Sequence, residues 1–326
     1  MVGAQVPALP TATERNFSPT ALERYATCPF QYFAEKVLRL KPLRRLHHDH
    51  LPPIMLGTLV HESLRVSYER LVLLQWPDDS LPEVTVQSTV HQAVTDTFAA
   101  HAASQGTGHA LLWTLAREQV TELVTAAVSS DQAEYQATGF RPVAFEVAAQ
   151  GIVPLESDAS SVPLTLRGTL DRVDYRAEPP ALRIVDYKFK QGNEITAVDR
   201  NLALSAVRGF RLQPPLYARM TLPSLPAPTE VQLLFLAPQW KQPVSRSTFD
   251  AGLWTGHTGD MIRQTLSTLI QGIARREFFI LPNGYCDSCE YSGACRRHDA
   301  MAWWRSYRSP QARALRRLRK QKVNDE

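Results

Sequence analysis

Helical periodicity dominates the first half of the chain. Between about residues 56 and 136, apolar side chains recur at intervals of three and four, as at Leu111 and Leu115, which places them on one helix face. Nearer the N-terminus, Ser18 followed by proline is typical of a helix start, and Pro29 ends that helix. Similar patterns predict further helices over residues 30–40, 214–220 and 260–276.

Shorter runs that favour β-structure follow this helical half. They cover residues 142–154, 163–175, 182–188 and 231–237, lengths typical of strands. Helices thus come first, and strands with crossover helices come next. This order predicts an α/β fold, a small mixed sheet flanked by helices with a large N-terminal helical insertion, rather than a doubly wound parallel sheet.

Two of the expected strands carry acidic residues in a pattern suited to metal chemistry. Asp171 lies fifteen residues before Asp186, a spacing that fits an antiparallel hairpin turning around residues 177–180. Asp186 and Lys188 are two apart on one strand, so their side chains point to the same face. Paired carboxylates bind a hard divalent cation, while a lysine orients water and offsets negative charge on a phosphate. The trio predicts metal-assisted phosphodiester hydrolysis.

Three nearby polar residues have both a chemical and a structural interpretation. His61 lies one helical turn after a glycine, and it is either a ligand or a hydrogen-bonded helix histidine. Glu146, on the preceding strand, either completes the carboxylate set or faces solvent. Asp174 is three residues from Asp171, so a regular strand turns it to the opposite side. We interpret Asp174 as solvent-facing or structural.

A glutamine and a tyrosine mark the start of the helix expected near residue 214. Gln213 and Tyr217 are four residues apart and share a helix face. A glutamine at this position either hydrogen-bonds a base or phosphate or caps the helix. The chain contains neither a phosphate-binding Gly-x4-Gly-Lys-Ser/Thr loop nor a Gly-x-Ser-x-Gly elbow. A phosphate-loop ATPase and a serine hydrolase of that type are therefore not supported.

Positive charge is concentrated near the C-terminus. Residues 296–322 contain ten Lys and Arg but one acid, whereas the formal net charge of the whole chain is only +4. Trp303, Trp304 and Tyr307 precede a helix-prone basic run over residues 313–320. Such a segment predicts either a phosphate-binding surface or a solvated terminal helix.

Length and apolar content set the expected organisation. The 326 residues contain no apolar run long enough to cross a bilayer, and the N-terminus lacks the basic start and apolar stretch of a secretion signal. We therefore expect a cytoplasmic protein. We also expect an unstructured leader over residues 1–17, one domain over residues 18–300 and a basic tail over residues 301–326.

The four cysteines are distributed in a way that favours metal binding. Cys286, Cys289 and Cys295 lie within ten residues of one another, whereas Cys28 is near the other end of the chain. In a cytoplasmic protein this spacing predicts a metal centre rather than disulfides. Three thiolates need one more ligand for a four-sulfur site, and Cys28 is the remaining thiol. Zinc and iron–sulfur are not distinguished by spacing.

Together these motifs resemble the PD-(D/E)XK nucleases of the RecB-like group, and most closely the C-terminal nuclease domains of the AddB type. The similarity runs in chain order through Ser18–Phe33, Gly57–His61, Gly168–Asp171, Asp186–Lys188, Gln213–Tyr217 and the three C-terminal cysteines. It covers about residues 17–300. The resemblance implies a restriction-endonuclease-like core with a C-terminal iron–sulfur segment.

The resemblance also implies a role for each motif. Asp171, Asp186, His61 and the Tyr187 carbonyl would bind the metal, and Lys188 would be the catalytic lysine. Gln213 and Tyr217 would position the nucleic-acid strand. A [4Fe–4S] cluster, or alternatively a structural zinc, would be held by Cys28, Cys286, Cys289 and Cys295.

The implied activity is a Mg²⁺- or Mn²⁺-dependent deoxyribonuclease, a single-strand exonuclease that serves double-strand-break repair. Its partners would be DNA, with single-stranded ends, and a helicase subunit, with no membrane involved. The alternative is a non-catalytic DNA-end-binding or assembly module of a helicase–nuclease complex.

Overall fold

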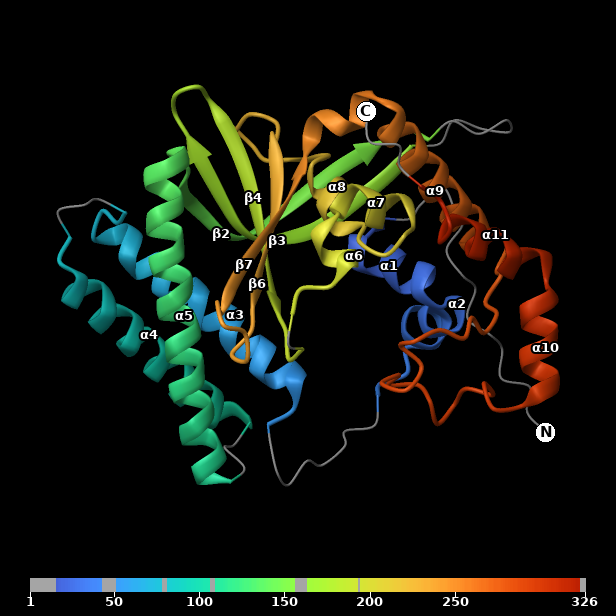
Figure 1. Ribbon diagram of the computed structural model, residues 1–326, viewed down its shortest axis with the longest axis horizontal. Helices are drawn as coiled ribbons and strands as arrows, with labels where there is room; N and C mark the ends of the chain where they lie inside the picture. Colours follow the sequence, from blue (N-terminus) through green and yellow to red (C-terminus); the bar gives the residue numbers. More distant parts are fainter. Residues whose placement is uncertain are drawn as a thin grey trace.

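A mixed β-sheet forms the centre of the molecule, with helices on both of its faces (Figure 1). The computed structural model describes residues 16–42, 51–77, 81–105, 109–155, 163–192 and 194–322. Among these residues, no helix is both long enough and apolar enough to span a membrane. Most of the expected leader, residues 1–15, lies outside the described residues, as do the last four residues of the expected tail.

The sheet has the strand order β5-β2-β3-β4-β6-β7, and β1 pairs with β3 beside this path. Pairing is parallel between β1 and β3 and between β4 and β6, and antiparallel elsewhere. The strands are β1 (Asn16–Phe17), β2 (Arg141–Val153), β3 (Leu164–Arg176), β4 (Ala181–Phe189), β5 (Met220–Thr221), β6 (Glu230–Leu236) and β7 (Val244–Asp250). The predicted mixed sheet flanked by helices is confirmed, and β1, β5 and β7 are additional to the four expected strands.

Three long helices, inserted in the chain between β1 and β2, cover one face of the sheet (Figure 1). They are α3 (Pro53–Leu73), α4 (Glu83–Gln105) and α5 (Ala110–Thr138). Their apolar side chains pack against Val185 and Tyr187 of β4 and Leu234 of β6. This is the helical insertion that the periodicity over residues 56–136 predicts.

The other face of the sheet packs against the remaining helices, with Leu22 of α1, Leu216 of α8 and Leu266 of α9 in one core with Ile184 of β4. These helices are α1 (Pro19–Thr27), α2 (Pro29–Tyr32), a π-helical turn (Phe33–Val37), α6 (Ala197–Arg200), α7 (Leu202–Val207), α8 (Gln213–Tyr217), a 3-10 turn (Ala251–Thr255), α9 (His257–Ala274), α10 (Ala300–Arg308) and α11 (Pro310–Leu318). Helix α8 ends earlier than expected because the chain turns into β5, which pairs with β2.

The segments at both ends of the described chain are packed. Phe17, at the end of the expected leader, is buried in the core around α1, and Asn16 and Phe17 pair with Thr165 and Leu166 of β3. In the expected basic tail, α11 buries Ala312, Leu315 and Leu318 in the same core.

A buried ionic network joins the helical layer to the sheet. The Arg172 guanidinium on β3 donates to Asp131 Oδ2 of α5 at 2.6 Å and to Asp174 Oδ2 at 2.9 Å. Arg246 of β7 donates to the other Asp131 oxygen at 2.7 Å, and the Tyr68 hydroxyl also donates to Asp131. Asp174 is thus fully buried in a structural ion pair rather than facing solvent.

Candidate active site

The hairpin of β3 and β4 brings the two site aspartates together. Its turn covers residues 177–180, as the sequence predicts, and Arg176 pairs with Ala181 across it. At the far end of the hairpin, the Tyr187 backbone N–H donates to Asp171 Oδ2 at 2.8 Å. Asp171 of β3 is therefore fixed beside Asp186 of β4.

Lys188 and Asp186 share one face of β4, as their spacing predicts. The Lys188 ammonium lies 2.5 Å from Asp186 Oδ2 and donates to Gln213 Oε1 at 2.8 Å. The Gln213 amide in turn donates to Asp186 Oδ1 at 3.1 Å. Asp186 is only 2% exposed, so it depends on these partners for compensation of its charge.

His61 reaches the same site from helix α3. Its Nδ1 lies 3.4 Å from Asp171 Oδ2, and its ring meets the edge of the Tyr187 ring with centroids 5.6 Å apart. Burial lowers the pKa of His61, against the opposing effects of the Asp186 charge and of a hydrogen bond to the Tyr187 backbone. A neutral imidazole is the form that binds a metal ion.

The charges in this site are unequally compensated. Burial raises the pKa of Asp171, and the neighbouring Asp186 charge raises it further. Burial lowers the pKa of Lys188, but the charge of Asp186 and the hydrogen bond to it act in the opposite direction, and the net shift is upward. The site thus holds a protonated lysine and two carboxylates that repel one another.

This donor set has the chemistry of a divalent-cation site, because close carboxylate oxygens are hard ligands and the cation relieves their repulsion. Nevertheless, no group of three or more His, Cys, Asp or Glu side chains in the described parts of the chain is arranged to hold a metal ion. The residues fit the expected cation in type and neighbourhood, and Asp171, Asp186 and His61 are the ones that would hold it.

Glu146 provides a third carboxylate at a kink in the sheet. It lies opposite Asp171, between the residue pairs Phe145–Arg172 and Val147–Leu170. On both strands, side chains two residues apart across this point face opposite layers, since Leu170 joins the α1 core whereas Arg172 contacts α5. The backbone of Glu146 has φ +48°, a strained conformation for a residue with a side chain.

Glu146 is electrostatically part of the aspartate pair. Burial raises the pKa of Glu146, which the Asp186 charge also raises, and the Glu146 charge in turn raises the pKa of Asp171. The sequence left Glu146 between a ligand and a solvent-facing residue. Its exposure is intermediate, and the kink turns it toward the site.

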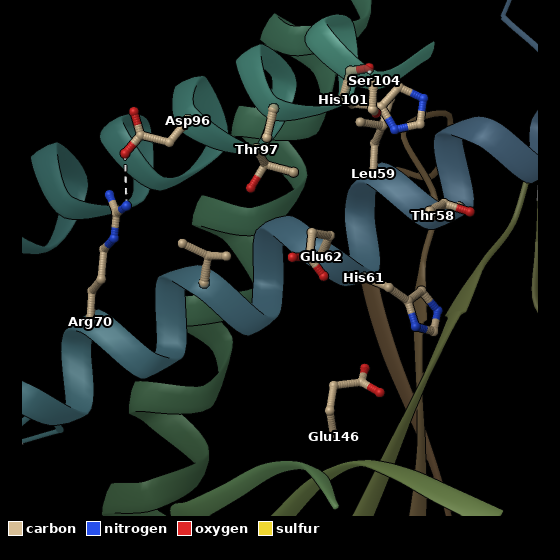
Figure 2. Close-up of a pocket in the computed structure, with 13 residues that line it drawn as sticks. Thr58, Leu59, His61, Glu62, Arg70, Asp96, Thr97, His101, Ser104 and Glu146 are labelled. Carbon is tan, nitrogen blue, oxygen red and sulfur yellow. Dashed lines mark hydrogen bonds and ion pairs between the residues drawn. The ribbon is translucent and has the colours of Figure 1, made fainter.

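Two hollows meet at Gly57 and His61. The larger, about 830 Å³, lies between α3 and α4 and is lined also by Glu62 and Glu146, which face the same space as His61 in Figure 2. The smaller, about 450 Å³, is lined by Lys188 and other residues of the β4 end. His61 therefore lies between an acidic and a basic recess.

Gln213 and Tyr217 are buried behind the reactive side chains. Gln213 donates to the Tyr217 hydroxyl at 3.0 Å as well as to Asp186. Neither residue lines the two hollows. In this arrangement their visible role is to support Asp186 and Lys188.

Glu23 is a supporting residue that the sequence does not reveal. Its Oε1 accepts hydrogen bonds from the backbone N–H groups of Leu212 and Gln213, at 2.6 and 2.9 Å. The Glu23 carboxylate also attracts the charge of Lys188. A buried glutamate on α1 thereby fixes the start of α8, and no local pattern in α1 could have indicated a partner 190 residues away.

The four cysteines are free and lie in one neighbourhood. Burial raises the pKa of Cys28, which the Cys286 charge also raises. Burial likewise raises the pKa of Cys295, as do the charges of the other three cysteines. Cys28 Sγ accepts from the Leu281 backbone at 3.5 Å. The fold thus brings the N-terminal cysteine to the C-terminal three, although no described residues form a coordination group.

A mixed sheet with an aspartate on one hairpin strand and Asp-x-Lys on the next, flanked by helices, defines a restriction-endonuclease-like nuclease. The sequence profile of the PD-(D/E)XK nuclease superfamily matches residues 16–296. The chain therefore belongs to the PD-(D/E)XK nuclease superfamily.

Curated relatives, each a subunit of an ATP-dependent helicase/deoxyribonuclease, share the region that contains the site. The chain is 29% identical over 218 residues to the relative from Moorella thermoacetica, covering 64% of this chain and 18% of that protein. It is 30% identical over 199 residues to the relative from Bacillus licheniformis, covering 57% and 16%. For Heliobacterium modesticaldum the values are 31% over 189 residues, 54% and 14%. The chain spans less than a fifth of the length of these relatives.

Proposed function

We propose that this protein is a Mg²⁺- or Mn²⁺-dependent deoxyribonuclease that hydrolyses phosphodiester bonds at single-stranded DNA ends. The observation that carries the proposal is the contact set around Asp186, which joins Lys188, Gln213 and the Asp171 hairpin at one point. Membership of the superfamily supports nuclease activity.

The proposed mechanism assigns a task to each side chain. Asp171, Asp186 and His61, with the Tyr187 carbonyl, would hold the cation. When bound, the cation would lower the pKa of a water molecule and polarise the scissile phosphate. Lys188, protonated in this environment, orients the attacking water and stabilises negative charge on the phosphate.

The supporting residues keep Lys188 in place. Gln213 holds the ammonium group and Asp186 together, and Tyr217 holds the Gln213 amide. We propose that this pair positions the DNA strand indirectly, by fixing the groups that contact it. Glu146 supplies further negative charge on the side of the larger hollow.

The biological setting follows from the relatives. Proteins named as subunits of an ATP-dependent helicase/deoxyribonuclease match this chain. We propose that the chain acts in double-strand-break repair, in the cytoplasm, beside a helicase subunit that delivers the DNA end. We also propose that Cys28, Cys286, Cys289 and Cys295 hold a [4Fe–4S] cluster that joins the N-terminal helices to the C-terminal segment.

A time course on single-stranded DNA labelled at either end, with Mg²⁺ or with EDTA, tests this function. Wild-type protein should shorten the DNA progressively from one labelled end, only with metal, and Lys188→Ala should lose at least about 100-fold of the rate. Lys241→Ala, which removes an exposed lysine elsewhere, is the matched control. Equal cleavage by the Lys188→Ala protein would refute the assignment.

One observation favours the second candidate, a non-catalytic DNA-end-binding module. The described residues contain no metal-ready group of three ligands. Wild-type protein that binds DNA ends equally well in EDTA and in Mg²⁺, without cleaving them in either, would establish that alternative.

A further inference from the structure

Helices α10 and α11 form a surface that the nuclease site does not explain. We call residues 300–320 the C-terminal helix pair. The superfamily match ends at residue 296, so the pair lies beyond the part of the chain that defines the family. Figure 1 shows both helices at the outer edge of the molecule, away from α3–α5.

The cations of the helix pair have no acidic partners. Arg305, Arg308, Arg313, Arg317 and Lys320 are exposed, and none forms an ion pair with a carboxylate that the structure describes. The one acid of residues 296–322 caps the start of α10 and pairs with an arginine in front of it. The helix pair is thus a patch of uncompensated positive charge.

This charge pattern is unfavourable for an isolated helix. Arg313 and Arg317 are four residues apart, so the two like charges are neighbours on α11 and repel each other. A solvated surface helix usually alternates charges of both signs. A polyanion bound along α11 would remove the repulsion and release counterions.

Aromatic rings stand between these cations. Trp304 and Tyr307 are 46% and 49% exposed, and Tyr307 stacks on Trp303 with centroids 4.9 Å apart and planes at 10°. The Arg308 guanidinium lies 4.1 Å from the Trp304 ring centre, and Arg316 lies 3.9 Å from that of Tyr307. Exposed rings beside guanidinium planes are the surface on which unpaired bases stack.

The helix pair is firmly attached to the elements that carry the site. Arg319 donates to the carbonyls of Ala26 and Thr27 at the end of α1, at 3.0 and 2.7 Å. Arg208, directly after α7, donates to the Gln321 carbonyl at 2.8 Å. The surface is therefore held in a fixed position relative to α1 and to the α7–α8 segment.

We propose that the C-terminal helix pair is a second nucleic-acid contact that binds single-stranded DNA, with phosphates along Arg313, Arg317 and Lys320 and a base on Trp304. The inference rests on the proposed choice of DNA as substrate, but it does not require cleavage. It assigns to this surface the capture of a strand that the nuclease site then cuts.

Fluorescence anisotropy with a labelled oligo(dT), in EDTA and over a range of salt concentrations, tests the charge. The triple variant Arg313→Ala/Arg317→Ala/Lys320→Ala should bind at least about tenfold more weakly, and its salt slope should fall by up to about 2, since each single-strand phosphate contact contributes about 0.7. A control with the same charge change, Arg141→Ala/Arg167→Ala/Lys241→Ala, removes exposed cations from other elements. Equal slopes for the two triple variants, or no loss in the first, would overturn the proposal.

The variant Trp304→Ala tests the stacking. It should weaken oligo(dT) binding about tenfold at unchanged salt slope, with its thermal unfolding temperature unchanged because Trp304 is exposed. A blunt duplex of equal length should be insensitive to the substitution. Equal sensitivity of the duplex would reject the single-strand assignment, and tighter binding of oligo(U) than of oligo(dT) would reject DNA as the ligand. Because all binding is measured without metal, a failure of cleavage would reject the nuclease proposal and leave this result standing.

Discussion

The Tyr187 backbone N–H donates a 2.8 Å hydrogen bond to the Asp171 carboxylate. A proposed metal ligand thereby also closes the open end of its own hairpin. Asp171→Asn keeps an acceptor for this bond but removes the charge, so the protein should fold normally while Mn²⁺ affinity falls and cleavage drops by about 100-fold or more. Calorimetric titration with Mn²⁺ and the DNA time course measure the two effects.

The comparison with Asp171→Ala separates the two roles of this side chain. The alanine variant leaves the Tyr187 N–H without its partner, which should cost an additional 1–3 kcal/mol or so in the free energy of unfolding. Equal stability of the two variants would mean that the hydrogen bond does not support the hairpin.

Glu23 should control cleavage without contacting DNA. In Glu23→Ala the N–H groups of Leu212 and Gln213 lose their acceptor, so α8 shifts and Gln213 no longer fixes Lys188. We expect about a tenfold loss of cleavage rate, the size typical of supporting residues. Glu23→Gln retains an acceptor oxygen and should restore most of the rate. A glutamine variant as slow as the alanine variant would show that the charge, and not the hydrogen bonds, matters.

The buried pair of Asp131 and Arg172 predicts a pH-dependent stability. Burial raises the pKa of Asp131, but the Arg172 and Arg246 charges outweigh this effect and lower it to about 2. Because the folded-state pKa lies below the unfolded value, the stabilisation is present above about pH 4 and is lost as the pH falls toward 2.

Urea unfolding of Asp131→Asn at pH 7 and at lower pH measures this contribution. At pH 7 the variant should lose about 3 kcal/mol, because Arg172 remains buried with one partner fewer. The difference from wild type should shrink by about 2 kcal/mol on approaching pH 2. A difference that stays constant with pH would contradict the lowered pKa.

The cysteine centre makes a spectroscopic prediction. Anaerobically purified protein should contain iron and acid-labile sulfide in equal amounts and absorb broadly in the visible range, whereas Cys289→Ser should be colourless and unfold at a lower temperature. Ser288→Ala, beside it, is the control. Stoichiometric zinc in a colourless wild-type protein would exclude the cluster.

Gln31 offers a finer test of the same centre. Its amide donates to Cys289 Sγ at 3.0 Å, and hydrogen bonds to cluster sulfur ligands are among the factors that set the reduction potential. Because such a bond favours the more negative, reduced state, Gln31→Leu should keep the iron content but shift the potential to more negative values. An unchanged potential would mean that the amide does not act on the cluster.

Local patterns were sufficient to predict the hairpin and its reactive groups. The spacing of Asp171 and Asp186 fits a turn over residues 177–180, and the two-residue period puts Lys188 beside Asp186. The edge strand β7 was missed because its run Val-Ser-Arg-Ser-Thr-Phe-Asp has little apolar content, and edge strands need less burial.

The supporting groups could not be predicted in the same way. Glu23 acts on backbone N–H groups far along the chain, a contact that only the tertiary fold creates. The kink at Glu146 requires a positive φ in a residue that rarely adopts one. Asp174 was assigned correctly as structural, but its burial depends on Arg172 finding Asp131 across the layers.

Helix α1 has Glu23 in its middle and Cys28 directly after its end. One rigid element of nine residues thus connects the sulfur chemistry to the alignment of the cutting machinery. We expect an enzyme of this design to fail safely, because oxidation that releases Cys28 would slacken α1 and misalign Lys188. A damaged copy would then stop cutting chromosomal DNA instead of degrading it without restraint.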